Sequence, residues 1–216
     1  MDRCKLGDFF VNQILEWTQS NYRCFPWRKE DVGIYESLIA ELMLRRTTSK
    51  QVESVYFEFV ETFSSPDILE QASLIQLESL LMPLGLKSQR SVALKKIASF
   101  LVQQGIPTSL DEIKTLPHVG TYISNAVGCF SLGLRVPIID SNVIRIFSRF
   151  FGVSSIPDNR RNKDIQLLAN EILPQNEYVS YNYGLLDFGA IVCVKNPNCS
   201  ECMLSQFCHY LKQKDQ

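Results

Sequence analysis

The sequence predicts an all-α protein, and three observations support this. Apolar residues recur at helical spacing along most of the 216 residues. Residues typical of helix starts precede several of these apolar runs, and no alternation of apolar and polar residues is long enough to require a β-strand. Apolar residues make up 45% of the chain and aromatic residues 11%, which is enough to bury a sizeable core. We therefore expect a folded protein of about ten short helices.

The first clear helical pattern lies in IYESLIAELML, residues 34–44. Leu38, Ile39 and Leu42 belong to one apolar stripe along this segment. VYFEFVETF, residues 55–63, continues the pattern after a break. These two segments predict two consecutive helices.

Capping residues locate several helix starts. Three pairs have the spacing of a capping box, in which a Ser or Thr is followed three positions later by Gln or Glu. They are Thr48 and Gln51, Ser73 and Gln76, and Ser109 and Glu112. Pro66 directly follows Ser65, as a proline in the first helical position follows its cap.

The segment TLPHVGTYISNAVGCFSLG, residues 115–133, predicts two helices joined by a hairpin. Pro117 ends the first helix, Gly120 permits a tight turn, and residues 122–130 form the second helix. Such a hairpin directs backbone N–H groups and a helix N-terminus at one point, which suits a phosphate group. The alternative interpretation is an ordinary connection between two helices.

The charge of the whole chain does not indicate a nucleic-acid binder. The net charge is −1 and the isoelectric point is about 6.2, so any such function must depend on local features. Three basic clusters exist, and each could also be an ordinary solvated surface. They are Arg45, Arg46 and Lys50; Lys87, Arg90, Lys95 and Lys96; and Arg160, Arg161 and Lys163.

No segment approaches the roughly 18 apolar residues of a membrane span, and the N-terminus does not resemble a cleavable signal. We therefore expect a cytoplasmic protein without membrane contact, whose cysteines are kept reduced.

Four of the seven cysteines lie within sixteen residues, in the pattern C-x5-C-x2-C-x5-C. These are Cys193, Cys199, Cys202 and Cys208. Thiolate ligands select tetrahedral zinc or an iron–sulfur cluster, and the spacing alone leaves this choice open. His209 is an alternative ligand, although four cysteines already complete a tetrahedron. The other three cysteines are expected to be packing residues.

Six motifs in order give the chain a resemblance to the helix-hairpin-helix DNA glycosylases of the endonuclease III superfamily. They are FPWR (25–28), AELMLRRTTSKQV (40–52), LGLKSQR (84–90), LPHVGTYISNAV (116–127), IIDSNVIRIFSRFFG (138–152) and YGLLDFGAIVC (183–193). The resemblance implies two helical domains flanking a DNA-binding cleft. Residues 28–136 would form a six-helix domain with the helix-hairpin-helix, and residues 1–27 with 137–216 a discontinuous iron–sulfur cluster domain. It also implies that the four cysteines hold a [4Fe–4S] cluster.

The resemblance assigns catalytic positions as well. Asp140 matches the catalytic carboxylate of the family, which can stabilise positive charge on the sugar or hold the attacking water. Asp140 is also a good helix N-cap ahead of SNVIRIF. Tyr122 occupies the position of a lysine in members that also cut the strand, so its presence implies hydrolysis without lyase activity. The spacing of Glu41 would allow an inward-facing side chain, although the local pattern by itself favours an ordinary exposed glutamate. The resemblance reverses this, because Glu41 matches a glutamate that contacts the flipped base or assists its departure.

DNA contacts are implied for three groups. The RRTT sequence at residues 45–48 resembles that of mismatch-specific thymine and uracil glycosylases, whereas adenine-removing members usually carry glutamines there. Arg45 or Arg46 would contact the guanine left without its partner, and Leu86 would fill the gap in the base stack. The hairpin residues His118, Val119 and Gly120 would contact phosphate.

One further feature bears on the substrate, and two residue positions differ from the family motifs. Adenine members carry a further C-terminal domain, whereas this sequence stops soon after Cys208. His118 replaces the first glycine of the usual LPGVG hairpin. The first cysteine gap is one residue shorter than usual.

These expectations combine into a monomeric, monofunctional DNA glycosylase acting on double-stranded DNA, which removes thymine or uracil mispaired with guanine. It would be cytoplasmic, and associated with the nucleoid in a bacterium or archaeon. An adenine DNA glycosylase is the alternative in the same class. A non-catalytic DNA-binding or redox-sensing module is the alternative in a different class.

Overall fold

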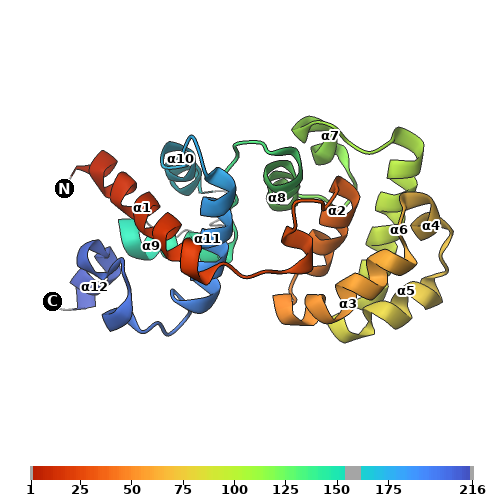
Figure 1. Ribbon diagram of the computed structural model, residues 1–216, viewed down its shortest axis with the longest axis horizontal. Coiled ribbons are helices and arrows are strands. Elements are labelled where there is room, and N and C mark those ends of the chain that lie inside the picture. The colour runs from red at the N-terminus through yellow and green to blue at the C-terminus, as the bar shows by residue number, and fades with distance from the viewer. Residues whose placement is uncertain (1, 154–161, 215–216) are drawn as a thin grey trace. The chain divides into compact units, whose positions relative to one another are not determined.

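The computed structural model describes residues 2–153 and 162–214, and within these residues every regular element is helical (Figure 1). The all-α prediction is confirmed. The α-helices are α1 (Arg3–Asn21), α2 (Ile34–Met43), α3 (Ser49–Thr62), α4 (Pro66–Gln71), α5 (Leu74–Leu81), α6 (Lys87–Gln104), α7 (Leu110–Thr115), α8 (Thr121–Leu132), α9 (Ser141–Phe151), α10 (Lys163–Glu171), α11 (Tyr178–Ile191) and α12 (His209–Lys214). Short 3-10 helices are η1 (Pro26–Arg28), η2 (Met82–Leu84), η4 (Cys199–Glu201) and η5 (Ser205–Phe207). Arg160 and Arg161 of the third basic cluster lie outside the described residues.

The chain divides into two compact units. The internal unit is Cys24–Leu134, and the terminal unit combines Met1–Arg23 with Arg135–Gln216. Each unit has its own hydrophobic core. None of the described helices is both long and apolar enough to cross a membrane.

Helix α2 is at the centre of the internal unit. Eight of its ten residues are buried, and it packs against α3, α6 and α8. Leu38 and Ile39 of the predicted apolar stripe are fully buried. A helix that is apolar on nearly all sides must be covered on all sides, and here the neighbouring helices provide that cover. Helices α4 and α5 pack on α6 within the same unit.

Capping fixes the helix starts largely as predicted. Both partners of the capping box are present at Thr48 and at Ser73, and Ser65 caps α4 ahead of Pro66. The third pair differs in one detail. Ser109 accepts a hydrogen bond from the N–H of Glu112, but the Glu112 carboxylate accepts from the N–H of Thr108 at 2.7 Å, one residue earlier than in a capping box.

The terminal unit brings the two ends of the sequence together. Helices α1 and α11 approach so closely at Gly184 that a Cβ there would lie 2.0 Å from Thr18 Oγ1, so this position requires glycine. Just after α1, the guanidinium of Arg23 donates to the fully buried carboxylate of Asp187, with Nε to Oδ1 at 2.6 Å and Nη2 to Oδ1 at 2.5 Å. This ion pair fastens residues 164 positions apart in sequence.

Candidate functional site

Asp140 begins helix α9 as its N-cap. Its Oδ1 accepts hydrogen bonds from the backbone N–H groups of Asn142 and Val143, both at 2.8 Å, and its Oδ2 accepts one from the side-chain amide of Asn142 at 2.8 Å. Burial raises the pKa of Asp140, whereas these donors and the guanidinium of Arg145 act in the opposite direction. A carboxylate has about four acceptor positions, so three bonds leave room for one further partner. The helix cap is therefore present, and it does not use the whole carboxylate.

A continuous hydrogen-bonded path connects Asp140 to the cysteine-rich segment. Asn142, which donates to Asp140, accepts at Oδ1 from Nη2 of Arg145 at 2.8 Å. Nε of Arg145 donates to the carbonyl oxygen of Cys193 at 2.7 Å. All four residues belong to the terminal unit. The position of the Asp140 carboxylate is thus tied to that of the Cys193 backbone, a connection that the sequence pattern did not reveal.

The four cysteines of the C-x5-C-x2-C-x5-C pattern all line one small cavity. Its volume is about 30 Å³, and the apolar residues around it include Phe150, Phe188 and Leu204. Burial raises the pKa of the Cys202 and Cys208 thiols, and repulsion between neighbouring cysteine thiolates acts in the same direction. In the described part of the chain, no three His, Cys, Asp or Glu side chains are close enough to share a single metal ion.

Arg149 supplies positive charge beside these thiols. Its Nη1 lies 3.5 Å from Cys193 Sγ and also donates to the carbonyl oxygen of Val194 at 2.6 Å. Cys208 Sγ lies 3.5 Å from the carbonyl oxygen of Arg149. His209, the alternative ligand, does not line the cavity, and its ring packs against Gly152 at the end of α9. The donor set around the cavity is therefore made of thiols.

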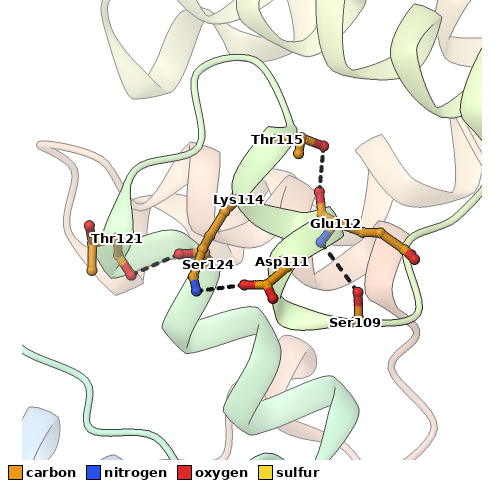
Figure 2. Close-up of polar contacts among 7 residues, drawn as sticks. All are labelled: Ser109, Asp111, Glu112, Lys114, Thr115, Thr121 and Ser124. Atoms are coloured by element: carbon orange, nitrogen blue, oxygen red, sulfur yellow. Dashed lines mark hydrogen bonds and ion pairs between the residues drawn. The ribbon is translucent and has the colours of Figure 1, made fainter.

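The predicted helix-hairpin-helix consists of α7, the segment 116–120 and α8 (Figure 2). Side-chain contacts stabilise both helices: Lys114 pairs with Asp111 at 2.9 Å, and the hydroxyl of Ser124 donates to the carbonyl oxygen of Thr121 at 3.1 Å. Gly120 is the N-cap of α8 and provides no side-chain hydrogen bond to the first turn. The cap residue itself therefore occupies none of the backbone N–H groups of that turn, which suits a phosphate-binding hairpin.

His118 adopts the left-handed backbone conformation in this hairpin, with φ of 62°, whereas Gly120 has an extended backbone with φ of −94°. The residue of this tight turn that must adopt a positive φ is therefore His118 and not Gly120. Space around Gly120 is open, because a Cβ built there would meet no atom within 4 Å.

Glu41 and Tyr122 both belong to the internal unit, whereas Asp140 belongs to the terminal unit. Glu41 lies on α2 and is only 5% exposed, as the resemblance implied and the local pattern alone did not. Tyr122 lies in the first turn of α8, where it is half-buried and packs against the core of the internal unit.

A cavity of about 660 Å³ opens in the internal unit. It is lined by four of the residues expected to contact DNA, namely Arg45, Arg46, Leu86 and His118. The sequence did not single out its other polar lining residues as DNA contacts, and these are Ser88, Gln89 and Arg90 of α6. The cavity is rich in arginine, with no acidic residue in its lining.

This cavity also gathers strained backbone. Four non-glycine residues in the described chain have positive φ, and three of them, Arg46, Leu86 and His118, line this cavity. Such conformations cost free energy and are found mainly where function requires them. Their convergence makes this cavity a candidate functional surface, and no local pattern in the sequence indicates the strain at Arg46 or Leu86.

Comparison with known proteins agrees with this arrangement. Residues 39–175 match the family model described as HhH-GPD superfamily base excision DNA repair protein. The chain is 35% identical over 205 residues to a thymine/uracil-DNA glycosylase from Pyrobaculum aerophilum, covering 91% of this chain and 88% of that protein. It is 31% identical over 211 residues to an adenine DNA glycosylase from Buchnera aphidicola subsp. Schizaphis graminum, covering 95% of this chain and 60% of that protein.

A solved structure of a thermostable thymine-DNA glycosylase has the same fold. The TM-score is 0.91, the sequence identity is 31%, and the match covers 97% of this chain and 98% of the other. The likeness therefore extends over both compact units.

Proposed function

The chain belongs to the HhH-GPD superfamily of base excision DNA repair proteins, and from this membership we propose that it is a monofunctional DNA glycosylase. It removes thymine or uracil mispaired with guanine in double-stranded DNA and leaves an abasic site. The similarity over 91% of the chain to a thymine/uracil-DNA glycosylase supports this substrate class. We infer that it acts as a monomer.

The observation that carries the catalytic assignment is the geometry of Asp140. Breaking the N-glycosidic bond leaves positive charge on the sugar, which a carboxylate stabilises electrostatically. Three N–H donors hold Asp140 in one orientation, so no reorganisation is needed as charge develops. Its partial burial strengthens the interaction, because water screens it less. The electron pair of the broken bond leaves with the base, the oxygen of water adds to C1′ of the sugar, and the proton that this water loses neutralises the departed base.

Glu41 and Tyr122 are assigned to the base. A buried carboxyl group such as that of Glu41 can contact the extruded base or assist its departure. The half-buried ring of Tyr122 can stack on the same base. Tyr122 has no amine, and neither has Asp140 or Glu41, so none of these residues can trap the sugar covalently. Hydrolysis without strand cleavage is therefore the expected outcome.

The arginine-lined cavity is assigned to the opposite strand. Arg45 and Arg46 suit the two acceptors on the edge of guanine, and Leu86, which is 47% exposed, can enter the gap in the stack. His118, Val119 and Gly120 of the hairpin are assigned to the phosphate backbone, with the uncapped first turn of α8 as the anion-binding feature.

The four cysteines around their common cavity are proposed to bind a [4Fe–4S] cluster. Four thiols, an apolar surround and a neighbouring guanidinium fit such a group, since thiolate ligands and nearby donors to sulfur are typical of iron–sulfur sites. When bound, the cluster cross-links the segment 193–208. The chemistry of base release remains with Asp140 and Glu41.

The test is base release from duplexes that contain T·G, U·G, A·G or A opposite 8-oxoguanine, followed by alkali to reveal abasic sites. Strand cleavage of the T·G and U·G duplexes only after alkali is expected. Release of adenine alone would instead support the second candidate, an adenine DNA glycosylase, which the 31% identity to the Buchnera protein favours.

Asp140→Asn separates an enzyme from a binding module. Asparagine caps a helix about as well as aspartate, so the fold and duplex affinity should remain. Base release should fall by at least about 10²-fold, the usual contribution of such a group. A variant with undiminished release would remove Asp140 from the mechanism, and an inactive wild-type chain that binds duplex DNA would indicate a non-catalytic module.

A further inference from the structure

Arg90 on α6 uses every donor of its guanidinium inside the internal unit. Arg90 is only 7% exposed, and the five N–H groups of its guanidinium donate to five acceptors. The acceptors are the carbonyl oxygens of Gly85 (from Nε, 3.0 Å), Leu42 and Met43 (from Nη1, 2.7 and 3.0 Å) and Arg45 (from Nη2, 2.6 Å), and the hydroxyl oxygen of Thr47 (from Nη2).

Two of these acceptors lie directly before strained residues. The carbonyl of Arg45 precedes Arg46, with φ of 56°, and the carbonyl of Gly85 precedes Leu86, with φ of 50°. The carbon of each carbonyl is the first of the four atoms that define the φ torsion of the next residue. A hydrogen bond to that carbonyl therefore helps to hold the left-handed conformation of the next residue, at a cost that the surrounding structure must offset.

Two other acceptors anchor the guanidinium to a rigid element. The carbonyl groups of Leu42 and Met43 lie in the last turn of α2, where the helix provides no partner for them. The loop that contains Arg46 and the loop that contains Leu86 are thus fixed to the buried end of one helix by a single side chain. Burial lowers the pKa of Arg90, and the charge of Arg45 adds to this effect.

We infer that Arg90 is the positioning residue that holds Arg46 and Leu86 in a fixed mutual arrangement, so that both engage a mispair at once. This inference depends on the proposed function. The planar guanidinium of Arg90, with its five donors, is thus needed for mispair recognition as well as for the stability of the two loops. Lysine keeps the charge but has three donors without the planar geometry, so it cannot reproduce these contacts.

The experiment compares Arg90→Lys with Arg135→Lys. Arg135 also donates to backbone carbonyl groups, those of Leu173 and Pro174, but it lies in the terminal unit. Dissociation constants are measured for a U·G duplex and a fully paired duplex of the same sequence, in the Asp140→Asn background that prevents turnover. Arg90→Lys should lower the preference for the U·G duplex by about tenfold or more, as loss of charged hydrogen bonds predicts. Arg135→Lys should preserve it.

A double-mutant cycle separates positioning from general stability. If Arg90 acts through Leu86, Arg90→Lys should cost little further preference in a Leu86→Ala background. Additive losses, or equal weakening for paired and mispaired duplexes, would overturn the inference.

Thr47 provides a milder test, should Arg90→Lys fail to fold. Thr47→Val removes one acceptor of the guanidinium and should reduce the mispair preference, whereas Thr47→Ser, which keeps the hydroxyl, should retain it. Equal preference in the two variants would contradict the inference. If the protein with Arg90 and Thr47 intact does not prefer the U·G duplex, both the proposed function and the inference fail. If it prefers the U·G duplex and both Arg90→Lys and Thr47→Val keep that preference, only the inference fails.

Discussion

Asp140 illustrates how one residue combines a structural and a proposed catalytic task. As an N-cap it must accept backbone N–H groups, and as a catalytic carboxylate it must stay ionised and rigidly held. The same three hydrogen bonds serve both tasks, because they lower the pKa that burial raises. Asn142 contributes two of these donors, one from its backbone and one from its side chain.

The pH dependence of base release should report on this balance. Hydrogen bonds to the ionised carboxylate lower its pKa, so Asn142→Ala, which removes the side-chain donor, should raise the pKa of Asp140 further. The acidic limb of the pH–rate profile, measured in single turnover, should therefore move to higher pH. Asn170→Ala is the matched control, since the Asn170 amide donates to the carbonyl of Gln166 within α10. A limb that stays in place, or moves to lower pH, would show that Asp140 does not control this step.

The sequence could predict functional residues whose type and spacing match a known motif. It could not predict residues that work by binding backbone carbonyl groups far away in the sequence. Glu41 and the four cysteines were located from local pattern and resemblance. Arg90 belonged to a basic cluster that is ordinarily solvated, yet it is buried, because its acceptors lie up to 48 residues away. Backbone carbonyl groups are present at every residue, so no sequence pattern marks them as partners.

Among the elements, the hairpin between α7 and α8 was predicted best, because proline, glycine and capping residues mark it directly. The left-handed residue of this hairpin is His118, which replaces a glycine of the usual motif. The strain at Arg46 and Leu86 was not anticipated, because neither residue type favours the left-handed region.

His118→Gly should separate the role of the imidazole from that of the backbone. Relief of the left-handed conformation contributes roughly 1–2 kcal/mol. The greater freedom of glycine in the unfolded chain costs about 0.4–1 kcal/mol. The free energy of unfolding, measured in urea, should therefore rise by about 0–1.6 kcal/mol. Affinity for duplex DNA should fall if the imidazole that lines the cavity contacts the strand; unchanged affinity would restrict the DNA contact to the hairpin backbone.

At the scale of the whole molecule, the terminal unit depends on long-range connections, because its two parts are separated by the entire internal unit. The Arg23 and Asp187 ion pair is one such connection, and it is partly to fully buried. Arg23→Met leaves the Asp187 charge buried without this partner, which typically costs about 3–5 kcal/mol. Arg3→Met is the control, since the pair of Arg3 with Glu171 is exposed and exposed pairs contribute about 0–1 kcal/mol. Similar urea midpoints for both variants would contradict this assignment.

The cysteine-rich segment provides another long-range connection, within the second part of the terminal unit. Loss of the proposed cluster releases the segment 193–208 and with it the Cys193 carbonyl that Arg145 binds. Through Arg145 and Asn142, this loosens Asp140, so base release should fall even though no cysteine contacts the substrate in this mechanism. Iron content, colour after anaerobic purification and limited proteolysis are measured on the wild-type protein, on Cys208→Ser and on Cys4→Ser.

Cys208→Ser should lose iron and become sensitive to protease near residues 193–208, while peptides from the internal unit stay protected, because that unit has its own core. Cys4→Ser should match the wild type, since Cys4 is exposed and does not line the cavity. A colourless wild-type protein with stoichiometric zinc would overturn the iron assignment. Loss of iron with unchanged base release would instead break the proposed connection between the cysteine segment and Asp140, because that connection requires the two to be held by one continuous set of hydrogen bonds.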